Sequence, residues 1–521
     1  MRGEKPGTAA DRGAIAVSIM LPRIMQGLDT TIANVALPHI QGSLSASQAE
    51  ISWVLTSYIV AAAVMMPLTG WLAGRLGIKY VYLASVAGFT LASALCGSAT
   101  SLSGLVVYRV LQGICGAGMV PLSQAVLLQI YPVERHGQAM AIFGIGSIMG
   151  PVTGPVLGGW LTENYSWRWV FYINLPVGAL ATLGILLFLR ETGRAHREAF
   201  DFFGFLALSV AVGALQMLLD RGQQKDWFGS TEIWVEATIS AVAFYLLLIH
   251  TLTASGGSFL NRELLRSPNF VVGVILMFFL GMVLNGTLAL LPTMLQALMN
   301  YPVLTAGIAT APRALGTMLA MFMVARLIGR VDTRLLILFG LLATAFSLWQ
   351  MTGFSLAMGM GLVVLSGLGQ GFGVGCIFVP INTLALSHLP RSILTQGTAL
   401  RSLMRNLGGS IGIAVLEARL TENTQIVHSR LVEGLRPDNP LMHAPYLAPQ
   451  WSLSAPAGVA ALNAEVTRQA AMVAYIDDFK LMMILVVVTL PLLLLVRRQG
   501  PLPLRAEARL AAPAGRPAQA D

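Results

Sequence analysis

The sequence predicts an all-α polytopic membrane protein with fourteen transmembrane helices, arranged as two six-helix halves with two helices inserted between them. Charged residues make up only 11% of the 521 residues, against about 25% in soluble domains, and hydrophobic residues reach 55%. The mean hydropathy is +0.71. Apolar stretches of about 20 residues, the length that a helix needs to cross a bilayer, recur along the chain.

The first six apolar stretches form the predicted N-terminal half, residues 14–200, which follows a polar tail, residues 1–13. The first stretch runs straight out of this tail at full spanning length, so it predicts an uncleaved anchor rather than a signal peptide. Turns rich in polar residues and glycine separate each stretch from the next. The six predicted spans cover residues 14–38, 51–73, 80–98, 104–127, 138–161 and 167–189.

The remaining stretches complete the pattern. Residues 201–256 hold the two inserted helices, and residues 257–500 hold the C-terminal half. A proline-rich segment of mixed charge, 417–476, predicts a partly ordered periplasmic loop, and the Ala-, Pro- and Arg-rich tail 501–521 predicts disorder. The eight predicted spans of this part cover residues 202–219, 231–254, 269–291, 304–326, 334–353, 359–380, 396–416 and 477–497.

The distribution of Lys and Arg predicts the orientation, because short cytoplasmic loops are enriched in both. The short connections on the other side carry only Arg168, Arg221 and Lys225. Both termini are therefore predicted to be cytoplasmic, in the inner membrane of a bacterium. The basic side holds Arg75, Lys79, Arg135, Arg190, Arg194, Arg197, Arg262, Arg266, Arg326, Arg330, Arg334, Arg391, Arg497, Arg498, Arg505 and Arg509.

Several function classes find no support in the sequence. The net charge of +9 falls in the short loops, so membrane orientation explains it better than nucleic-acid binding. Cys96, Cys115 and Cys376 lie at unrelated spacings within predicted spans, which favours neither disulfides nor a metal site. The sequence contains no recognisable P-loop, metal-ligand cluster or nucleophile–base arrangement, so neither an enzyme nor an ATPase is indicated.

Two similar segments indicate an internal repeat. The turn after the second span and the turn after the tenth match at one offset, 255 residues, through the pairs Gly74/Gly329, Arg75/Arg330 and Lys79/Arg334. The fourth and twelfth spans both carry Gln-Gly, at residues 112–113 and 370–371, followed by small residues and a proline. Repeated halves around a central site are typical of alternating-access transporters.

Asp29 is the carboxylate that the sequence places deep within a span. Counted from the cytoplasmic end of its helix, Asp29 lies about 22 Å deep, at about 1.5 Å per residue. Arg109 lies about five residues into the descending fourth span, at nearly equal depth, so the two residues could pair. Ionised groups at such depth usually mark ion or substrate pathways. A purely structural role, with Asp29 bonded to a neighbouring hydroxyl and Arg109 to backbone carbonyls, is the alternative.

Other polar side chains within the spans are candidates to line a substrate cavity, although each could equally bond a neighbouring helix. Arg313 and Arg405 fall near the middle of the membrane with no acid at their depth, which favours anionic or weakly acidic substrates. Arg401 is a third arginine within these spans. The candidate cavity residues are Asn34, Gln112, Gln124, Asn285, Arg313, Gln370 and Arg405.

The fifth span carries a stripe suited to close helix packing. Gly150, Gly154 and Gly158 recur every four residues and so share one helix face. Pro151 and Pro155 each remove a backbone hydrogen bond and permit bending. A helix of this kind suits a moving interface, and tight static packing is the alternative.

Together these motifs resemble the major facilitator superfamily, specifically its 14-helix drug:proton antiporters of the EmrB type. The turn after the second span matches the family at Gly70, Arg75, Gly77 and Lys79, whereas Gly74 replaces the usual Asp and leaves the strength of the family's cytoplasmic latch in doubt. The segments that carry the resemblance are residues 28–38, 67–73, 109–113, 150–159, 219–222, 226–228 and 409–412.

The resemblance implies a proton-driven multidrug efflux transporter for hydrophobic or amphiphilic compounds, including weak acids. It implies proton coupling through Asp29 and Arg109, no cofactor beyond the transmembrane proton gradient, and a periplasmic adaptor and outer-membrane channel as partners. A dedicated exporter of one metabolite, such as a fatty acid or siderophore, is the main alternative. A channel is a further one, although selectivity-filter repeats are missing.

Overall fold

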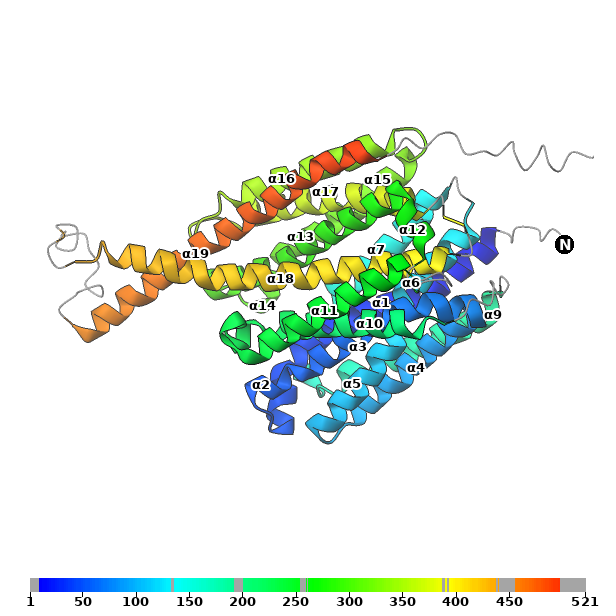
Figure 1. Ribbon diagram of the computed structural model, residues 1–521. Coiled ribbons are helices and arrows are strands. Elements are labelled where there is room, and N and C mark those ends of the chain that lie inside the picture. Colours follow the sequence, from blue (N-terminus) through cyan, green and yellow to red (C-terminus); the bar gives the residue numbers. More distant parts are fainter. Residues whose placement is uncertain are drawn as a thin grey trace, which may run out of the picture.

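The computed structural model describes residues 9–132, 135–191, 200–253, 259, 261–386, 389–390, 393–436, 439 and 455–496, which are almost entirely helical (Figure 1). These residues contain no strand, only one isolated bridge between Ile328 and Val331. The predicted tail 501–521 lies outside the described residues, as does the tail 1–13 up to residue 8. Residues 9–13 belong to the first helix.

The N-terminal half contains six spans. The helical hydrogen bonding of the fourth is interrupted near Ala117 and Gly118, and that of the sixth near Ile173. The helices are α1 (Ala9–Leu44), α2 (Gln48–Ile51), α3 (Trp53–Leu76), α4 (Ile78–Ser98), α5 (Leu102–Gly116), α6 (Met119–Ile130), α7 (His136–Asn164), α8 (Trp169–Tyr172) and α9 (Asn174–Phe188).

The two inserted helices form a hairpin that packs against both halves. α10 (Phe202–Arg221) contacts α3 and α18 as well as its partner α11 (Thr231–Thr253). Asp201 caps α10, because its carboxylate accepts the backbone N–H of Gly204. The hairpin thus lies beside the boundary between the halves.

The C-terminal half repeats the packing of the N-terminal half. The pairs α1–α7, α3–α5, α4–α5 and α4–α9 correspond to α13–α18, α15–α17, α16–α17 and α16–α19. The helices here are α12 (Arg262–Arg266), α13 (Pro268–Met299), α14 (Val303–Thr310), α15 (Pro312–Leu327), α16 (Thr333–Met351), α17 (Met360–Leu386), α18 (Leu394–Val432) and α19 (Pro456–Thr489).

Each turn of the predicted repeat contains a glycine in a left-handed backbone conformation, but the two glycines are not at matching positions of the sequence repeat. Gly77 follows α3 with φ +96°, and Gly329 follows α15 with φ +89°, a backbone conformation that favours glycine. These two glycines are 252 residues apart, so the sequence match at an offset of 255 pairs positions that are not equivalent in the turns. Gly74 itself lies within the last turns of α3.

Within the described residues, twelve helical segments are long and apolar enough to cross a membrane. α1 and α18 are two further long helices that run alongside them (Figure 1). Buried charges, among them Asp29 and Arg401, lower the mean hydropathy of these two helices. The all-α polytopic class is confirmed, and the architecture agrees with fourteen spans.

The helices α18 and α19 are longer than the sequence interpretation allowed. Both project beyond the other helices, so much of the predicted loop 417–476 is helical (Figure 1). Charged pairs at helical spacing, Arg419–Glu422 and Glu465–Arg468, stabilise these polar extensions, which a hydropathy pattern does not detect.

Candidate functional site

Asp29 and Arg109 form a buried ion pair inside the N-terminal half. Arg109 Nη1 lies 2.7 Å from Asp29 Oδ2, and each residue is only 1% exposed. α1 supplies Asp29 and α5 supplies Arg109, so the two side chains that the depth count placed at one level are in contact. Since an isolated charge at this depth is very costly, each group stabilises the other.

Amide side chains complete the environment of the ion pair. Gln112 Nε2 and Asn174 Nδ2 donate to Asp29 Oδ1 over 2.8 and 3.0 Å. Arg109 also donates to Gln112 Oε1 and, from Nε, to the carbonyl of Val54. Both carboxylate oxygens of Asp29 therefore have donors, which helps to keep a charged pair stable away from water.

Tyr58 and Gln26 surround the ion pair and connect it to the preceding turn of α1. The Arg109 guanidinium lies 4.4 Å from the centre of the Tyr58 ring. Gln26, one turn before Asp29, donates to the Tyr58 hydroxyl over 3.4 Å and to the carbonyl of Gly116 over 3.1 Å. Gly116 ends α5 at the interruption of the fourth span. The ion pair is thus connected to the interruption of that span.

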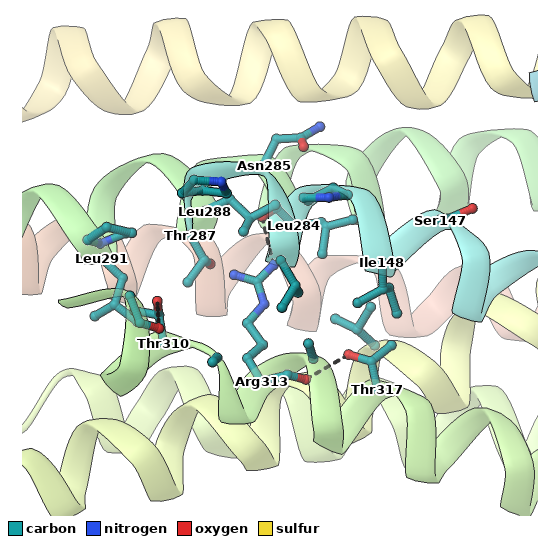
Figure 2. Close-up of a pocket in the computed structure, with 18 of the residues that line it drawn as sticks. Ser147, Ile148, Leu284, Asn285, Thr287, Leu288, Leu291, Thr310, Arg313 and Thr317 are labelled. Carbon is teal, nitrogen blue, oxygen red and sulfur yellow. Dashed lines mark hydrogen bonds between the residues drawn. The ribbon is translucent and has the colours of Figure 1, made fainter. Parts of the chain in front are cut away.

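A cavity of about 710 Å³ lies between the two halves. α1, α7, α13, α14, α15, α17 and α18 all contribute to its wall, which is mainly apolar. Figure 2 shows Arg313 reaching from α15 toward α13, where its Nη2 donates to the carbonyl of Leu284 over 2.9 Å. Three predicted cavity residues, Asn285, Arg313 and Arg405, line it.

The other predicted cavity residues lie elsewhere. Asn34 is exposed on α1, and Gln112 belongs to the Asp29 network. Gln124 accepts a hydrogen bond from Arg401 across the two halves. Gln370 is fully buried one layer behind the wall, where it donates over 2.8 Å to Thr287, a residue that does line the cavity.

Several polar residues of the cavity wall were not among the predicted ones, Arg23, Ser147 and Glu163 among them. Arg23 lies on α1 and donates from Nε to Ser147 Oγ on α7 over 2.9 Å, and both side chains face the cavity. Glu163, near the end of α7, is the carboxylate among the described lining residues. The signal for Arg23 was present in the sequence, since it is a cation within the first predicted span, six residues before Asp29.

The halves meet at one end of the bundle, which we call the basic end because its turns carry Arg75, Lys79, Arg326 and Arg330. A Cβ on Gly137 of α7 would lie 3.0 Å from Ile328, and one on Gly70 of α3 would lie 2.9 Å from the backbone of Gln396. The cavity instead extends toward the opposite end, where Trp160 and Glu163 belong to its wall.

The glycine stripe of α7 packs against α1. A Cβ on Gly150 would lie 2.6 Å from the carbonyl carbon of Gly27, and Gly154 lies directly against Thr31. Gly158 faces Ile32. On the same helix, Pro151 and Pro155 line the cavity. The stripe therefore joins the cavity wall to the turns of α1 that carry Asp29.

The turn after α3 packs within its own half. A Cβ on Gly77 would collide with the carboxylate of Glu191, whose Oε2 accepts the backbone N–H of Lys79 over 3.2 Å. The guanidinium of Arg75 lies 5.2 Å from the Trp71 ring. Of this motif, Gly70 makes the contact across the halves.

A family model described as the Major Facilitator Superfamily matches residues 19–413. The chain belongs to the major facilitator superfamily. It is 36% identical over 449 residues to the multidrug export protein EmrB of Escherichia coli K12, covering 86% of this chain and 87% of that one. It is 35% identical over 489 residues to the fatty acid resistance protein FarB of Neisseria gonorrhoeae, covering 93% and 96%. The expected likeness to EmrB-type proteins is confirmed.

Solved structures of the superfamily share the fold. The proton:xylose symporter XylE matches with a TM-score of 0.59 at 13% identity, covering 92% of this chain and 95% of that one. The human organic anion transporter MFSD10 matches with a TM-score of 0.57 at 16% identity, covering 91% and 99%. This superfamily member is a multi-pass membrane protein, and its described residues hold no cluster of three or more metal-ligating side chains.

Proposed function

We propose that this superfamily member is a proton-driven exporter of hydrophobic and amphiphilic compounds, weak acids among them. Two observations together carry the proposal. A mainly apolar cavity lies between the halves, and the buried Asp29–Arg109 pair includes a residue of α1, a helix that forms part of the cavity wall. Such a cavity accommodates varied apolar molecules. A carboxylate buried in a membrane is suited to carry a proton.

Alternating access follows from the closed basic end. With that end facing the cytoplasm, as the positive-inside rule favours, the cavity opens outward and both termini are cytoplasmic, in the inner membrane. The two halves, 14–200 and 257–500, rock about the central cavity in this proposal. The contacts at Gly70 and Gly137 separate when the cavity opens inward.

Proton coupling is assigned to Asp29. In the described state its carboxylate accepts hydrogen bonds from Arg109, Gln112 and Asn174. When Arg109 moves away while the cavity faces outward, the unpaired carboxylate takes up a proton from the outer side, because desolvation favours the neutral acid. Rocking then opens the cavity to the cytoplasm, and return of Arg109 expels the proton on that side. Gly150, packed on Gly27, couples movement of the cavity wall to this part of α1.

The substrate class follows from the charge of the cavity. Arg23 and Arg313 are buried in its wall, Arg405 is half-buried there, and Glu163 lies toward the open end. Buried guanidinium groups without a carboxylate partner favour a ligand that carries an anionic group on an apolar body. The relative named for fatty acid resistance supports an alternative, an exporter dedicated to long-chain carboxylates.

The transmembrane proton gradient supplies the energy in this proposal, and no bound cofactor takes part. We further propose that the exporter acts with a periplasmic adaptor and an outer-membrane channel, so that a compound leaving the cavity crosses both membranes. Nucleic acid is not among the proposed partners.

Reconstitution tests the function directly. Purified protein in liposomes with an acidic interior should accumulate a fluorescent amphiphile, because protons leaving the lumen drive the substrate in. Collapse of the gradient with an ionophore should stop accumulation. Flux that follows the substrate gradient alone, at the same rate with and without the proton gradient, would indicate a channel and overturn the proposal.

A further inference from the structure

Two adjacent carboxylates on α19 have opposite surroundings. Asp477 is exposed, whereas Asp478 is only 1% exposed. The Oδ2 atom of Asp478 has no hydrogen-bond partner among the described residues. An ionised carboxylate with a buried, unpartnered oxygen costs free energy, so these surroundings favour the neutral acid at Asp478. Asp29 is thus accompanied by a second buried acid, in the last span.

Among the described residues of the surrounding helices, no cation forms an ion pair with Asp478: Arg419 acts on it only from a distance, and Lys480, two residues further along α19, is exposed. α19 packs against α13, α16 and α18. α13 contains no titratable side chain, and α16 carries Arg334 in its first turn, at the basic end. On α18 the nearby charged groups are Glu417 and Arg419, and α19 itself adds Tyr475 and Asp477.

Arg419 forms its ion pair with Glu422 rather than with Asp478. Its side chain is 55% exposed and lies 3.7 Å from Glu422, its partner one turn along α18. Asp477 and Glu417 carry the same charge as an ionised Asp478 and would repel it. Binding of a proton would remove the negative charge of Asp478, and the buried side chain would then need no cationic partner.

The acid is connected to the cavity wall. Met482 lies one turn from Asp478 on α19, and its sulfur accepts a hydrogen bond from Thr287 Oγ1 over 3.6 Å. Thr287 lines the cavity. A Cβ on Gly286 would lie 3.3 Å from the same sulfur, so α13 and α19 are in close contact here. A shift of α13 against α19 would therefore alter the burial of Asp478.

We propose that Asp478 is a second proton-binding site of the transport cycle, in addition to Asp29. Its carboxylate takes up one proton from the solution on the outer side and becomes the neutral acid of the present conformation. The same proton leaves when a shift of α13 against α19, accompanying the rocking of the halves, exposes the group again, and no other bond forms or breaks. This inference rests on the proposed proton-driven transport, and it raises the number of protons moved per substrate.

Counting protons in proteoliposomes tests the inference, with Asp477→Asn as the matched control. Proton and substrate fluxes measured together give the ratio for each variant. We expect Asp478→Asn, which mimics the neutral acid, to lower the ratio by one proton while substrate exchange continues, and Asp477→Asn to keep the wild-type ratio. An unchanged ratio in Asp478→Asn overturns the second site.

Infrared spectroscopy provides a second test, which does not require the protein to transport substrate. Wild type and Asp477→Asn should both show the carbonyl band of a protonated carboxylic acid at neutral pH, and Asp478→Glu should shift that band. A band unaffected by Asp478→Glu contradicts the inference even if Asp478→Asn fails to fold. If the wild type shows no proton-coupled flux, the proposed function fails, and the band still reports whether Asp478 holds a proton.

Discussion

Asp29 and Arg109, eighty residues apart in the sequence, meet at 2.7 Å with both side chains sealed from the cavity and from the surface. The pair therefore cannot exchange protons with either side as it stands. Removing Arg109 would leave a buried carboxylate unpaired and would destabilise the folded protein by about 3–5 kcal/mol. A loss of transport in such a variant could therefore come from unfolding rather than from lost proton coupling. Conservative changes at Asp29 and changes at neighbouring glycines give clearer tests.

Gly150→Ala should destabilise the protein, because the added Cβ would lie 2.6 Å from the backbone of Gly27 and neither helix can yield cheaply. Overpacking of this kind costs about 1–3 kcal/mol. Thermal unfolding in detergent measures the effect. Gly159→Ala on the same helix is the control, since nothing lies within 4 Å of its Cβ position. Equal melting temperatures for the two variants would contradict the packing assigned to the stripe.

Gly70→Ala should weaken closure of the basic end, because its Cβ would lie 2.9 Å from Gln396 Cα in the other half. The expected result is a larger population open at that end, detected as faster labelling of a cysteine placed at Ile328. Gly74→Ala, whose Cβ meets nothing within 4 Å, should label at the unmodified rate. Slower or unchanged labelling in Gly70→Ala would contradict the role of this contact.

Arg313→Gln should impair export of a carboxylate amphiphile but not of its methyl ester. A hydrogen bond to a charged group contributes roughly 1.5–3 kcal/mol, which corresponds to about a tenfold or greater rise in KM for the acid. Arg330→Gln removes the same charge from an exposed turn outside the cavity and should leave both KM values unchanged. Equal losses for acid and ester would mean that Arg313 serves packing rather than anion recognition.

Asp201 introduces a pH dependence at the inserted hairpin. Burial opposes its ionisation, but the backbone N–H groups of Gly204 and Phe259, together with the ring of His250, hold the pKa of Asp201 below its usual range. A lowered folded-state pKa gives stability that is present above the unfolded pKa, about 3.9, and is lost as the pH falls through the folded value.

Asp201→Asn should therefore lower the melting temperature at neutral pH, by the equivalent of about 1 kcal/mol for a helix cap, and the difference should shrink below about pH 4. Asp226→Asn, at the exposed tip of the hairpin, is the control. A difference between wild type and Asp201→Asn that grows as the pH falls would reverse the sign expected here.

Composition and hydropathy were sufficient to predict the fold class, because a bilayer requires long apolar helices whatever their tertiary contacts. Depth counting also brought Asp29 and Arg109 to one level, since helix rise is nearly constant. The same reasoning could not predict which face of a helix turns inward. Gln112 and Gln370 were therefore expected in the cavity but lie behind its wall.

Three further features could not be predicted from the hydropathy pattern. Asp477 and Asp478 are indistinguishable in the sequence, and only the packing of α19 shows that one is buried. The extensions of α18 and α19 are polar helices, which local charge pairs stabilise and hydropathy overlooks. Arg23 was visible as a cation within a span, but its direction toward the cavity was not.

The most direct test of the account is gradient-driven transport by Asp29→Asn in proteoliposomes with an acidic interior. Asparagine preserves the shape of the side chain but cannot carry the proton. The account predicts loss of gradient-driven substrate accumulation, while exchange of labelled for unlabelled substrate continues, because exchange needs no net proton movement. Accumulation by Asp29→Asn at the wild-type level, with the same dependence on the proton gradient, would contradict the central claim that Asp29 couples protons to transport.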